Sequence, residues 1–324
     1  MTFGLWCLAA AVVAFGVTAV SGKWLIPFLH KLKFGQTVRE EGPESHKQKT
    51  GTPTMGGLVF IFSSIITSLL VNFNGIHSMG YLVVVLAFVG YGIIGFIDDY
   101  LIVVRKNNDG LKPSLKFLMQ SVLAVVFYLI YRNVTNSLVI VPFLNIYLDL
   151  GIFYVFVVFI MFTGESNAVN LTDGLDGLSA GLVVLAILPF IYFCVRIEQF
   201  DLGILLCAVV GSLIGYLRYN MHPAQIFMGD TGSLALGGLL AAVAMVTKEE
   251  IALILIGGVF VVEVVSVIIQ VGYFKITHGK RFFRMAPIHH HFELGGMDEQ
   301  KVVYLFWTVG AFLSLVGFMI GAFM

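Results

Sequence analysis

The strongest constraint on the fold is a series of apolar runs, each long enough, or nearly long enough, to cross a lipid bilayer. A membrane-crossing helix needs about 20 predominantly apolar residues. The runs occupy residues 2–22, 52–71, 80–97, 115–131, 150–163, 178–195, 203–217, 232–246, 251–274 and 302–323. Only 12% of the residues are charged, against about 25% in soluble domains. We therefore predict an all-α polytopic membrane protein with ten transmembrane helices, forming a single integral membrane domain over residues 1–324.

The basic residues predict how these helices are oriented. Of the 19 Lys and Arg residues, 16 fall in loops on one side, and only Arg132, Arg196 and Lys248 fall on the other. Loops rich in Lys and Arg remain in the cytoplasm. With ten crossings, both termini are then external, and the external loops are short apart from residues 132–149. The first run follows no basic residue, so we expect a retained helix and not a cleaved signal peptide.

Acidic residues gather on the same predicted cytoplasmic face. Asp98 and Asp99 follow the run 80–97. Adjacent carboxylates repel each other unless a cation or a proton lies between them, so this pair predicts Mg²⁺ or a raised pKa. Solvated charges at a helix end are the alternative, although the helix dipole disfavours acids at a C-terminus. Asp230 precedes the run 232–246, where a lone Asp would also serve as a helix cap.

The stretch NAVNLTDGLDGLSAG, residues 167–181, places three polar side chains next to two apolar runs. Asn170, Asp173 and Asp176 are three residues apart, which on a helix keeps them near one face. No Lys or Arg lies within ten residues of them in the sequence. Capping of the next helix explains one acid but not three polar groups. We interpret them as a ligand or cation site, because acids at a membrane are costly.

Two further motifs carry Lys and His. Lys49 precedes GTPTMGG, residues 51–57, and a Gly-rich helix start beside lysines suits phosphate, although anchoring at the cytoplasmic membrane face is the more ordinary cause of such a cluster. The motif APIHHHFE, residues 286–293, contains three consecutive His, which cannot all face one metal from a regular helix. Basic residues nearby favour phosphate or sugar binding there over a zinc site.

Together these residues predict phosphoryl chemistry at a membrane edge. Oxygen ligands without Cys suit Mg²⁺, and Mg²⁺ with Lys and His suits a phosphorylated substrate. The three Cys lie inside apolar runs and predict no disulfide, and the zero net charge indicates no nucleic-acid partner. No P-loop motif is present. A site at this edge would accept one lipid and one water-soluble substrate.

The motifs together resemble the polyprenyl-phosphate N-acetylhexosamine-1-phosphate transferase superfamily over essentially the whole chain. They are HKQKTGTPTMGG (46–57), GFIDDY (95–100), NAVNLTDGLDGL (167–178), NMHPAQIFMGDTGS (220–233) and APIHHHFE (286–293). GTPTMGG and PIHHHFE favour the branch that uses UDP-N-acetylmuramoyl-pentapeptide. The resemblance implies Mg²⁺-dependent transfer to undecaprenyl phosphate, which forms lipid I and UMP for peptidoglycan synthesis. It also implies a homodimer in the bacterial cytoplasmic membrane with its active site at the cytoplasmic face.

The resemblance also implies roles for individual residues. Asp230 would bind Mg²⁺, and Asp98 would deprotonate the lipid phosphate with Asp99 beside it. The predicted substrate-binding residues are Asn170, Asp173 and Asp176 in the nucleotide and metal pocket, Asn220 and Phe227 at the uridine, Lys49 and Lys116 at phosphates, and His289, His290 and His291 around the substrate. Many relatives carry a Lys where this chain has Ile102, so Arg105 or Lys106 would replace it, or that Lys is dispensable.

Two other functions compete with this interpretation. A transferase of the same superfamily that uses UDP-N-acetylglucosamine is disfavoured by the loop 286–293. An ion-coupled transporter would need polar residues near the middle of several spans. Glu263 is the one acid expected there, and we interpret it as part of a helix contact or a dimer interface. One-step attack and a covalent aspartyl-phosphate intermediate both fit the sequence.

Overall fold

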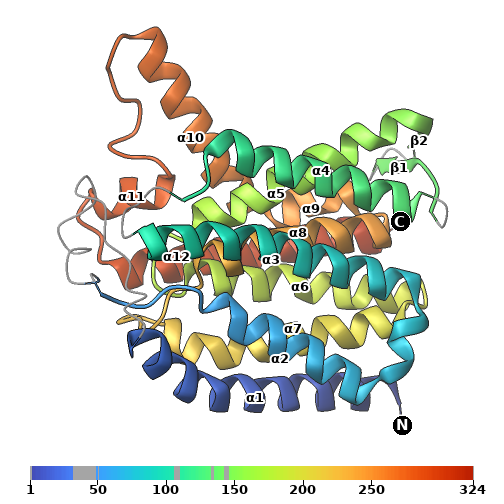
Figure 1. Ribbon diagram of the computed structural model, residues 1–324. Helices are drawn as coiled ribbons and strands as arrows, with labels where there is room; N and C mark the ends of the chain where they lie inside the picture. The colour runs from blue at the N-terminus through green and yellow to red at the C-terminus, as the bar shows by residue number, and fades with distance from the viewer. Residues whose placement is uncertain are drawn as a thin grey trace.

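In a computed structural model, the chain is described over residues 2–31, 49, 51–105, 110–132, 135–141 and 146–323, and helices make up most of it (Figure 1). The helices are α1 (Phe3–Lys31), α2 (Gly57–Val71), α3 (Met79–Arg105), α4 (Pro113–Tyr131), α5 (Tyr154–Thr172), α6 (Leu178–Arg196), α7 (Phe200–Asn220), α8 (Gly229–Thr247), α9 (Glu250–Ile256), α10 (Gly258–Ile276), α11 (Ile288–Glu293) and α12 (Glu299–Ala322). Two short 3₁₀ turns, η2 (Phe73–His77) and η3 (Gly151–Phe153), precede α3 and α5.

The predicted polytopic membrane architecture is confirmed at the level of its helices. Nine helices in the described residues have the length and hydropathy to cross a membrane, and α2 is shorter, with 15 residues. The run 52–71 is helical only from Gly57. The run 251–274 is not one helix but two, because the chain breaks at Gly257 between α9 and α10. Consecutive glycines at 257 and 258 explain this break, since each costs a helix about 1 kcal/mol relative to Ala.

Helix α8 is the centre of the bundle. It packs against α3, α5, α2 and α6, and 89% of its most apolar 18-residue window is buried. Its sequence is rich in Gly, Ala and Ser, and such small residues let membrane helices approach closely. A Cβ added at Gly95 of α3 would lie 2.0 Å from the backbone oxygen of Asp230. This contact brings the polar end of α3 directly against the first turn of α8.

A β-hairpin between α4 and α5 is the one departure from an all-α fold in the described residues. Strand β1 (Leu138–Val141) pairs antiparallel with β2 (Ile146–Asp149), and Leu138 lies opposite Asp149. The sequence analysis identified 132–149 only as a long external loop. The run LVIV, in which three of the four residues are β-branched, was a signal for a strand. Four residues, however, are too few to stand out among much longer apolar runs.

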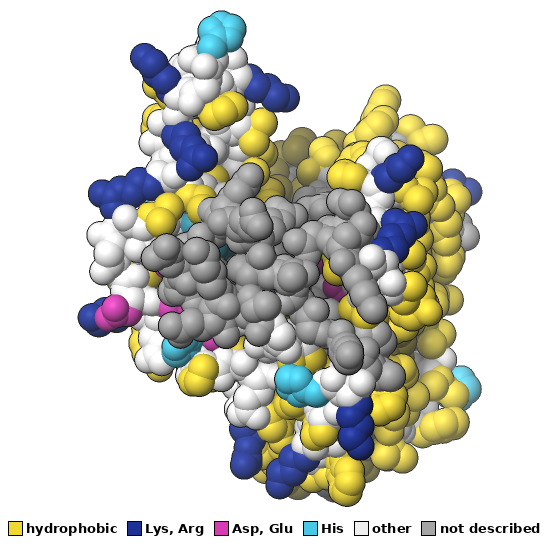
Figure 2. All heavy atoms as spheres, turned by 60° about the vertical axis from the view of Figure 1, so that its left-hand side comes forward, with side chains coloured by type: hydrophobic (Ala, Val, Ile, Leu, Met, Phe, Trp, Pro, Cys, Tyr) yellow, Lys and Arg dark blue, Asp and Glu magenta, His cyan; other side chains and the backbone are white. Residues whose placement is uncertain are grey.

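The two ends of the bundle differ in chemistry. Both termini lie at one end, and α11 lies at the other, beside the part of α10 that projects from the bundle (Figure 1). Figure 2 shows the α11 end, where Lys and Arg side chains lie around the rim and hydrophobic side chains cover the flanks. Exposed apolar residues such as Ile268 and Ile276 on α10 suit contact with lipid.

Candidate active site

Asp98 and Asp99 lie inside α3 and not at its end. The helix continues to Arg105, so the predicted run 80–97 stops about two turns too early. Both carboxylates are buried, with 6% and 4% of their residue surface exposed. Asp99 accepts hydrogen bonds from the backbone N–H groups of Asp230 at 3.1 Å and Thr231 at 3.0 Å, and from Thr231 Oγ1 at 2.6 Å. Asp99 therefore anchors the first turn of α8, where the helix dipole favours a negative charge.

Asp230 is the meeting point of three other elements. Asn170 Nδ2, from the last turn of α5, donates to Asp230 Oδ1 at 2.8 Å and to Ser233 Oγ at 2.8 Å. Lys116 Nζ, from the first turn of α4, forms an ion pair with Asp230 Oδ2. The side chain of Asp230 is 22% exposed, so it is accessible from outside. We call Asp98, Asp99, Asp230, Lys116 and Asn170 the acidic cluster.

Asp98 faces the same cluster and lies beside Gly110 and Leu111, in the loop before α4. Its Oδ1 accepts a hydrogen bond from Leu111 N–H at 2.9 Å, and the carboxylate interacts electrostatically with Asp230 and Lys116. Arg105 Nη1 donates to Gly110 O at 3.4 Å. Two residues were proposed to replace the Lys that is absent at Ile102. Arg105 binds the backbone next to Leu111, the residue that donates to Asp98. Lys106 lies outside the described residues.

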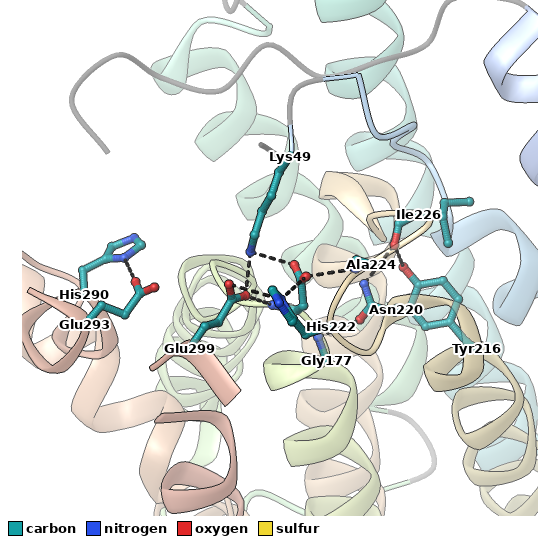
Figure 3. A network of polar contacts seen from close by, with 11 residues as sticks. Lys49, Gly177, Tyr216, Asn220, His222, Ala224, Ile226, His290, Glu293 and Glu299 are labelled. Carbon is teal, nitrogen blue, oxygen red and sulfur yellow. Dashed lines mark hydrogen bonds and ion pairs between the residues drawn. The ribbon is translucent and has the colours of Figure 1, made fainter. Parts of the chain in front are cut away.

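A second polar group, which we call the Lys49 cluster, contains Lys49, Asp176, His222 and Glu299 (Figure 3). Lys49 Nζ lies 2.7 Å from Asp176 Oδ1 and 2.5 Å from Glu299 Oε1. His222 Nδ1 lies 3.1 Å from Asp176 Oδ2 and 3.5 Å from Glu299 Oε2. The backbone N–H of Ala224 donates to Asp176 Oδ2 at 3.0 Å. Asp176, one of the two acids of the NAVNLTDGLDGLSAG stretch, therefore has its charge compensated by Lys49, which is 127 residues away in the sequence.

The prediction that Asn170, Asp173 and Asp176 share one helical face is wrong. Helix α5 ends at Thr172, and the turn to α6 passes through Gly177, whose φ of 80° is in the left-handed region that favours glycine. Asn170 consequently points into the acidic cluster, and Asp176 into the Lys49 cluster.

Asp173, in the turn between α5 and α6, is placed between the two clusters. Burial raises the pKa of its carboxyl well above the usual range, and the negative charges of Asp230, Asp99 and Asp176 raise it further. Lys49 opposes this effect. Asp173 therefore interacts with carboxylates of both groups. A cation bound among them would favour its ionised form.

The predicted uridine residues lie beside the Lys49 cluster. Asn220 is buried, donates from Nδ2 to Ile226 O at 2.9 Å, and accepts from Gly177 N–H at 3.2 Å (Figure 3). The backbone N–H of Phe227 donates to Pro53 O at 2.9 Å. The GTPTMGG motif thus lies against the chain segment that leads into α8. The side chain of Phe227 is partly exposed there.

The three consecutive His residues point to different partners, as the geometry of a helix requires. His289 is fully buried, and its Nδ1 lies 3.1 Å from Glu263 Oε1. His290 Nδ1 lies 2.7 Å from Glu293 Oε2 (Figure 3), and His291 Nδ1 accepts from the Arg284 backbone N–H at 3.1 Å. Glu263 is therefore a buried partner of the histidine motif in α11, and it does not lie on an exposed dimer surface.

Sequence reasoning did not single out His222 and Glu299 as site residues. His222 lies inside the motif NMHPAQIFMGDTGS, so the motif itself was a usable signal. Glu299 lies in the first turn of α12, where an acid is ordinary helix chemistry and carries no functional signal.

The acidic cluster has the donor chemistry that Mg²⁺ requires. It offers several carboxylate oxygens, one of them on the partly exposed Asp230, and hard oxygen donors suit Mg²⁺. Three other donors, from Asp176, His222 and Glu299, lie within 4.8 Å of one another. Lys49 Nζ already lies between the two carboxylates of that group and supplies the positive charge. The donors of the acidic cluster therefore fit Mg²⁺ better than those of the Lys49 cluster do.

The fold and the site define a multi-pass membrane protein with a carboxylate- and lysine-rich centre at one end of its helical bundle. Residues 81–248 match the model of glycosyl transferase family 4. A protein of Halalkalibacterium halodurans is 50% identical over 311 residues, covering 95% of each chain. Proteins of Staphylococcus carnosus and Bacillus thuringiensis are 48% and 49% identical, covering 96% and 98% of this chain and 98% of each relative.

All three relatives carry the name phospho-N-acetylmuramoyl-pentapeptide-transferase. The chain belongs to this family of bacterial membrane transferases.

Proposed function

We propose that the protein transfers phospho-N-acetylmuramoyl-pentapeptide from its UDP conjugate to undecaprenyl phosphate. The products are lipid I and UMP, and the reaction belongs to peptidoglycan biosynthesis in the bacterial cytoplasmic membrane. The observation that carries this proposal is that Asn170 and Asp176, three residues to either side of Asp173, belong to two clusters that each combine carboxylates with a Lys. Two phosphorylated substrates need such a combination of basic residues and a bound cation at a membrane edge.

In the proposed reaction, an oxygen of the lipid phosphate attacks the β-phosphorus of the nucleotide sugar. The bond from that phosphorus to the oxygen bridging the α-phosphate breaks, and UMP leaves with this oxygen. Asp98 accepts the proton of the lipid phosphate, because its carboxylate lies in the acidic cluster beside Asp230 and Lys116. Asp99 acts through its hydrogen bonds to the first turn of α8, which hold Asp230 in place.

The basic residues would then hold the phosphates. Lys116 and Lys49 each lie against carboxylates, so both are positioned before substrate binds. Asn220 and Phe227 would hold the uridine beside the Lys49 cluster, and Asn170 would orient Asp230. Asp230 would hold Mg²⁺, and the charge that such an ion supplies when bound would offset the negative charge of the transferred phosphoryl group. We take the acidic cluster, the Lys49 cluster and His289–His291 as the substrate site.

We further propose ten crossings, external termini and a cytoplasmic active site. The nine long helices and α2 give ten crossings, with α9 and α10 together forming one. Helix α2 would span only about 22 Å at 1.5 Å per residue, but the buried residues Thr54 and Met55 precede it inside the protein. The excess of Lys and Arg at the α11 end supports a cytoplasmic location for that end. A homodimer completes the proposal, on the resemblance to the superfamily.

The competing functions predict different products. A UDP-N-acetylglucosamine transferase would release UMP from that nucleotide sugar instead. A transporter would move an ion or solute across proteoliposomes without forming a product. The names of the relatives favour the muramoyl substrate.

The test uses purified protein in detergent with Mg²⁺, undecaprenyl phosphate and either nucleotide sugar, and it follows UMP release. We expect release only with the muramoyl-pentapeptide substrate, and loss of release in Asp230→Asn. Release with neither nucleotide sugar, from folded protein, would overturn the proposed function.

A further inference from the structure

Glu263 forms a buried pair with His289 that the proposed reaction has not used. Glu263 lies in the second turn of α10, and His289 lies in α11. The side chains of both residues are 0% exposed, and Glu263 Oε1 lies 3.1 Å from His289 Nδ1. A buried carboxylate is costly unless a hydrogen-bond donor compensates it. We assign the shared proton to His289 Nδ1, which then donates toward Glu263 and compensates its carboxylate.

This hydrogen bond leaves the second ring nitrogen free for another partner. Within the described residues, His289 Nε2 is buried and has no hydrogen-bond partner. It faces Gly174, because a Cβ built on Gly174 would lie 2.3 Å from it. Gly174 follows Asp173, the residue that interacts with both clusters. A buried, unpaired nitrogen beside the turn that carries Asp173 indicates a ligand atom, since an unsatisfied polar group costs about 1–3 kcal/mol.

The charge of Glu263 determines which ligand atom fits. The carboxylate of Glu263 stabilises the imidazolium that forms when Nε2 also carries a proton, as the Asp of a catalytic triad does, and in that form Nε2 is a donor. A donor of this kind binds an anionic oxygen best. Beside the turn that carries Asp173, the matching group is the diphosphate of the nucleotide sugar.

We infer that Glu263 is a positioning residue that orients His289 so that Nε2 donates to the diphosphate of the nucleotide sugar. This inference rests on the proposed transferase function. The pair works across two helices, because α10 supplies the carboxylate and α11 supplies the ring. Glu263 does not touch the substrate itself.

The test compares Glu263→Gln, Glu263→Asp and the control Glu165→Gln in the UMP-release assay. Glu165 is a matched control, since it is another buried membrane carboxylate, 7% exposed in α5, that does not contact His289. We expect Glu263→Gln to lower kcat about 10- to 100-fold, the range seen for outer partners of functional His. The KM for undecaprenyl phosphate should stay unchanged. Glu263→Asp keeps the charge and should recover part of the activity, which a general packing defect would not allow.

A double-mutant cycle adds a second readout. In a His289→Asn background, Glu263→Gln should change kcat less than about twofold, because the ring that it orients is gone. Glu263→Gln with normal kcat, or equal losses in both backgrounds, would overturn the inference while wild-type protein still releases UMP. Wild-type protein that releases no UMP would overturn the proposed function first, and the inference with it.

Discussion

Asp99 and Thr231 form a two-point contact between α3 and α8, in which Thr231 donates from its backbone N–H at 3.0 Å and from Oγ1 at 2.6 Å. This contact separates the two adjacent acids of GFIDDY into different roles. Asp99 stabilises the start of the helix that carries Asp230. Asp98 keeps one oxygen toward Leu111 and faces the acidic cluster.

The two acids should therefore respond differently to the same substitution. Asp99→Asn loses a charged acceptor at the N-terminus of α8, and we expect a loss of about 1–3 kcal/mol in stability together with reduced UMP release. Asp98→Asn removes a buried negative charge beside Asp230, so stability should be unchanged or higher while activity is lost. Thermal unfolding in detergent, measured beside UMP release, separates the two. An Asp99→Asn protein as stable as wild type would assign Asp99 a chemical role instead.

Removal of Mg²⁺ should affect stability as well as activity, and Lys116 should set the size of the effect. Lys116 supplies positive charge to Asp230 and its neighbouring carboxylates. In Lys116→Met, this positive charge is lost, and a bound cation would have to replace it. We expect EDTA to lower the unfolding temperature of Lys116→Met by more than that of wild type, and added Mg²⁺ to restore it. Equal shifts in both proteins would show that Asp230 does not bind the ion.

The sequence predicted the chemistry of the site better than its geometry. The apolar runs and the positions of the acids were sufficient to indicate a membrane protein with one polar end, because long hydrophobic segments have few alternative folds. The ends of helices were less predictable. Asp98 and Asp99 were expected after a helix and lie inside one, because the loop before α4 and the first turn of α8 supply hydrogen-bond donors that make their burial tolerable.

Contacts between distant segments were not predictable from local patterns. Lys49 and Glu299 are 250 residues apart in the chain, yet they share a hydrogen bond. Glu263 is isolated in an apolar run, and its partner His289 is on another element. Such contacts form only when the helices pack together. A single sequence therefore shows both residues but does not show that they are in contact.

Gly174 provides a steric test of the pocket beside His289. A Cβ at this position would lie 2.3 Å from His289 Nε2, so Gly174→Ala must displace the ring. We expect kcat for UMP release to fall tenfold or more, because a shift of about 1 Å at a reacting centre costs up to 100-fold. Gly164→Ala is the control, since no atom lies within 4 Å of a Cβ there. Its activity should match wild type. Normal activity in Gly174→Ala would mean that the substrate does not need His289 in this position.

The ion pair between Arg196 and Glu249, near the end of the bundle that holds the termini, predicts a pH-dependent stability. Burial raises the pKa of Glu249 to about 7, and Arg196 opposes this rise. The carboxyl of the unfolded chain ionises near its ordinary value of 4.5, so between these values the folded protein binds more protons. The linkage relation then requires stability to fall as pH rises from about 4.5 to about 7.

Arg196→Met removes the positive charge that lowers the pKa of Glu249. The pKa of Glu249 in the folded protein should therefore rise further, and the loss of stability should continue above pH 7. We expect the gap in unfolding temperature between wild type and Arg196→Met to be larger at pH 8 than at pH 6. Lys301→Met is the control, because Lys301 and Asp298 are 72% and 71% exposed and such surface pairs contribute about 0–1 kcal/mol. Its gap should be small at both pH values. An Arg196→Met gap that is the same at pH 6 and pH 8 would show that Glu249 does not titrate in this range, and that Arg196 stabilises the fold through Gly321 O alone.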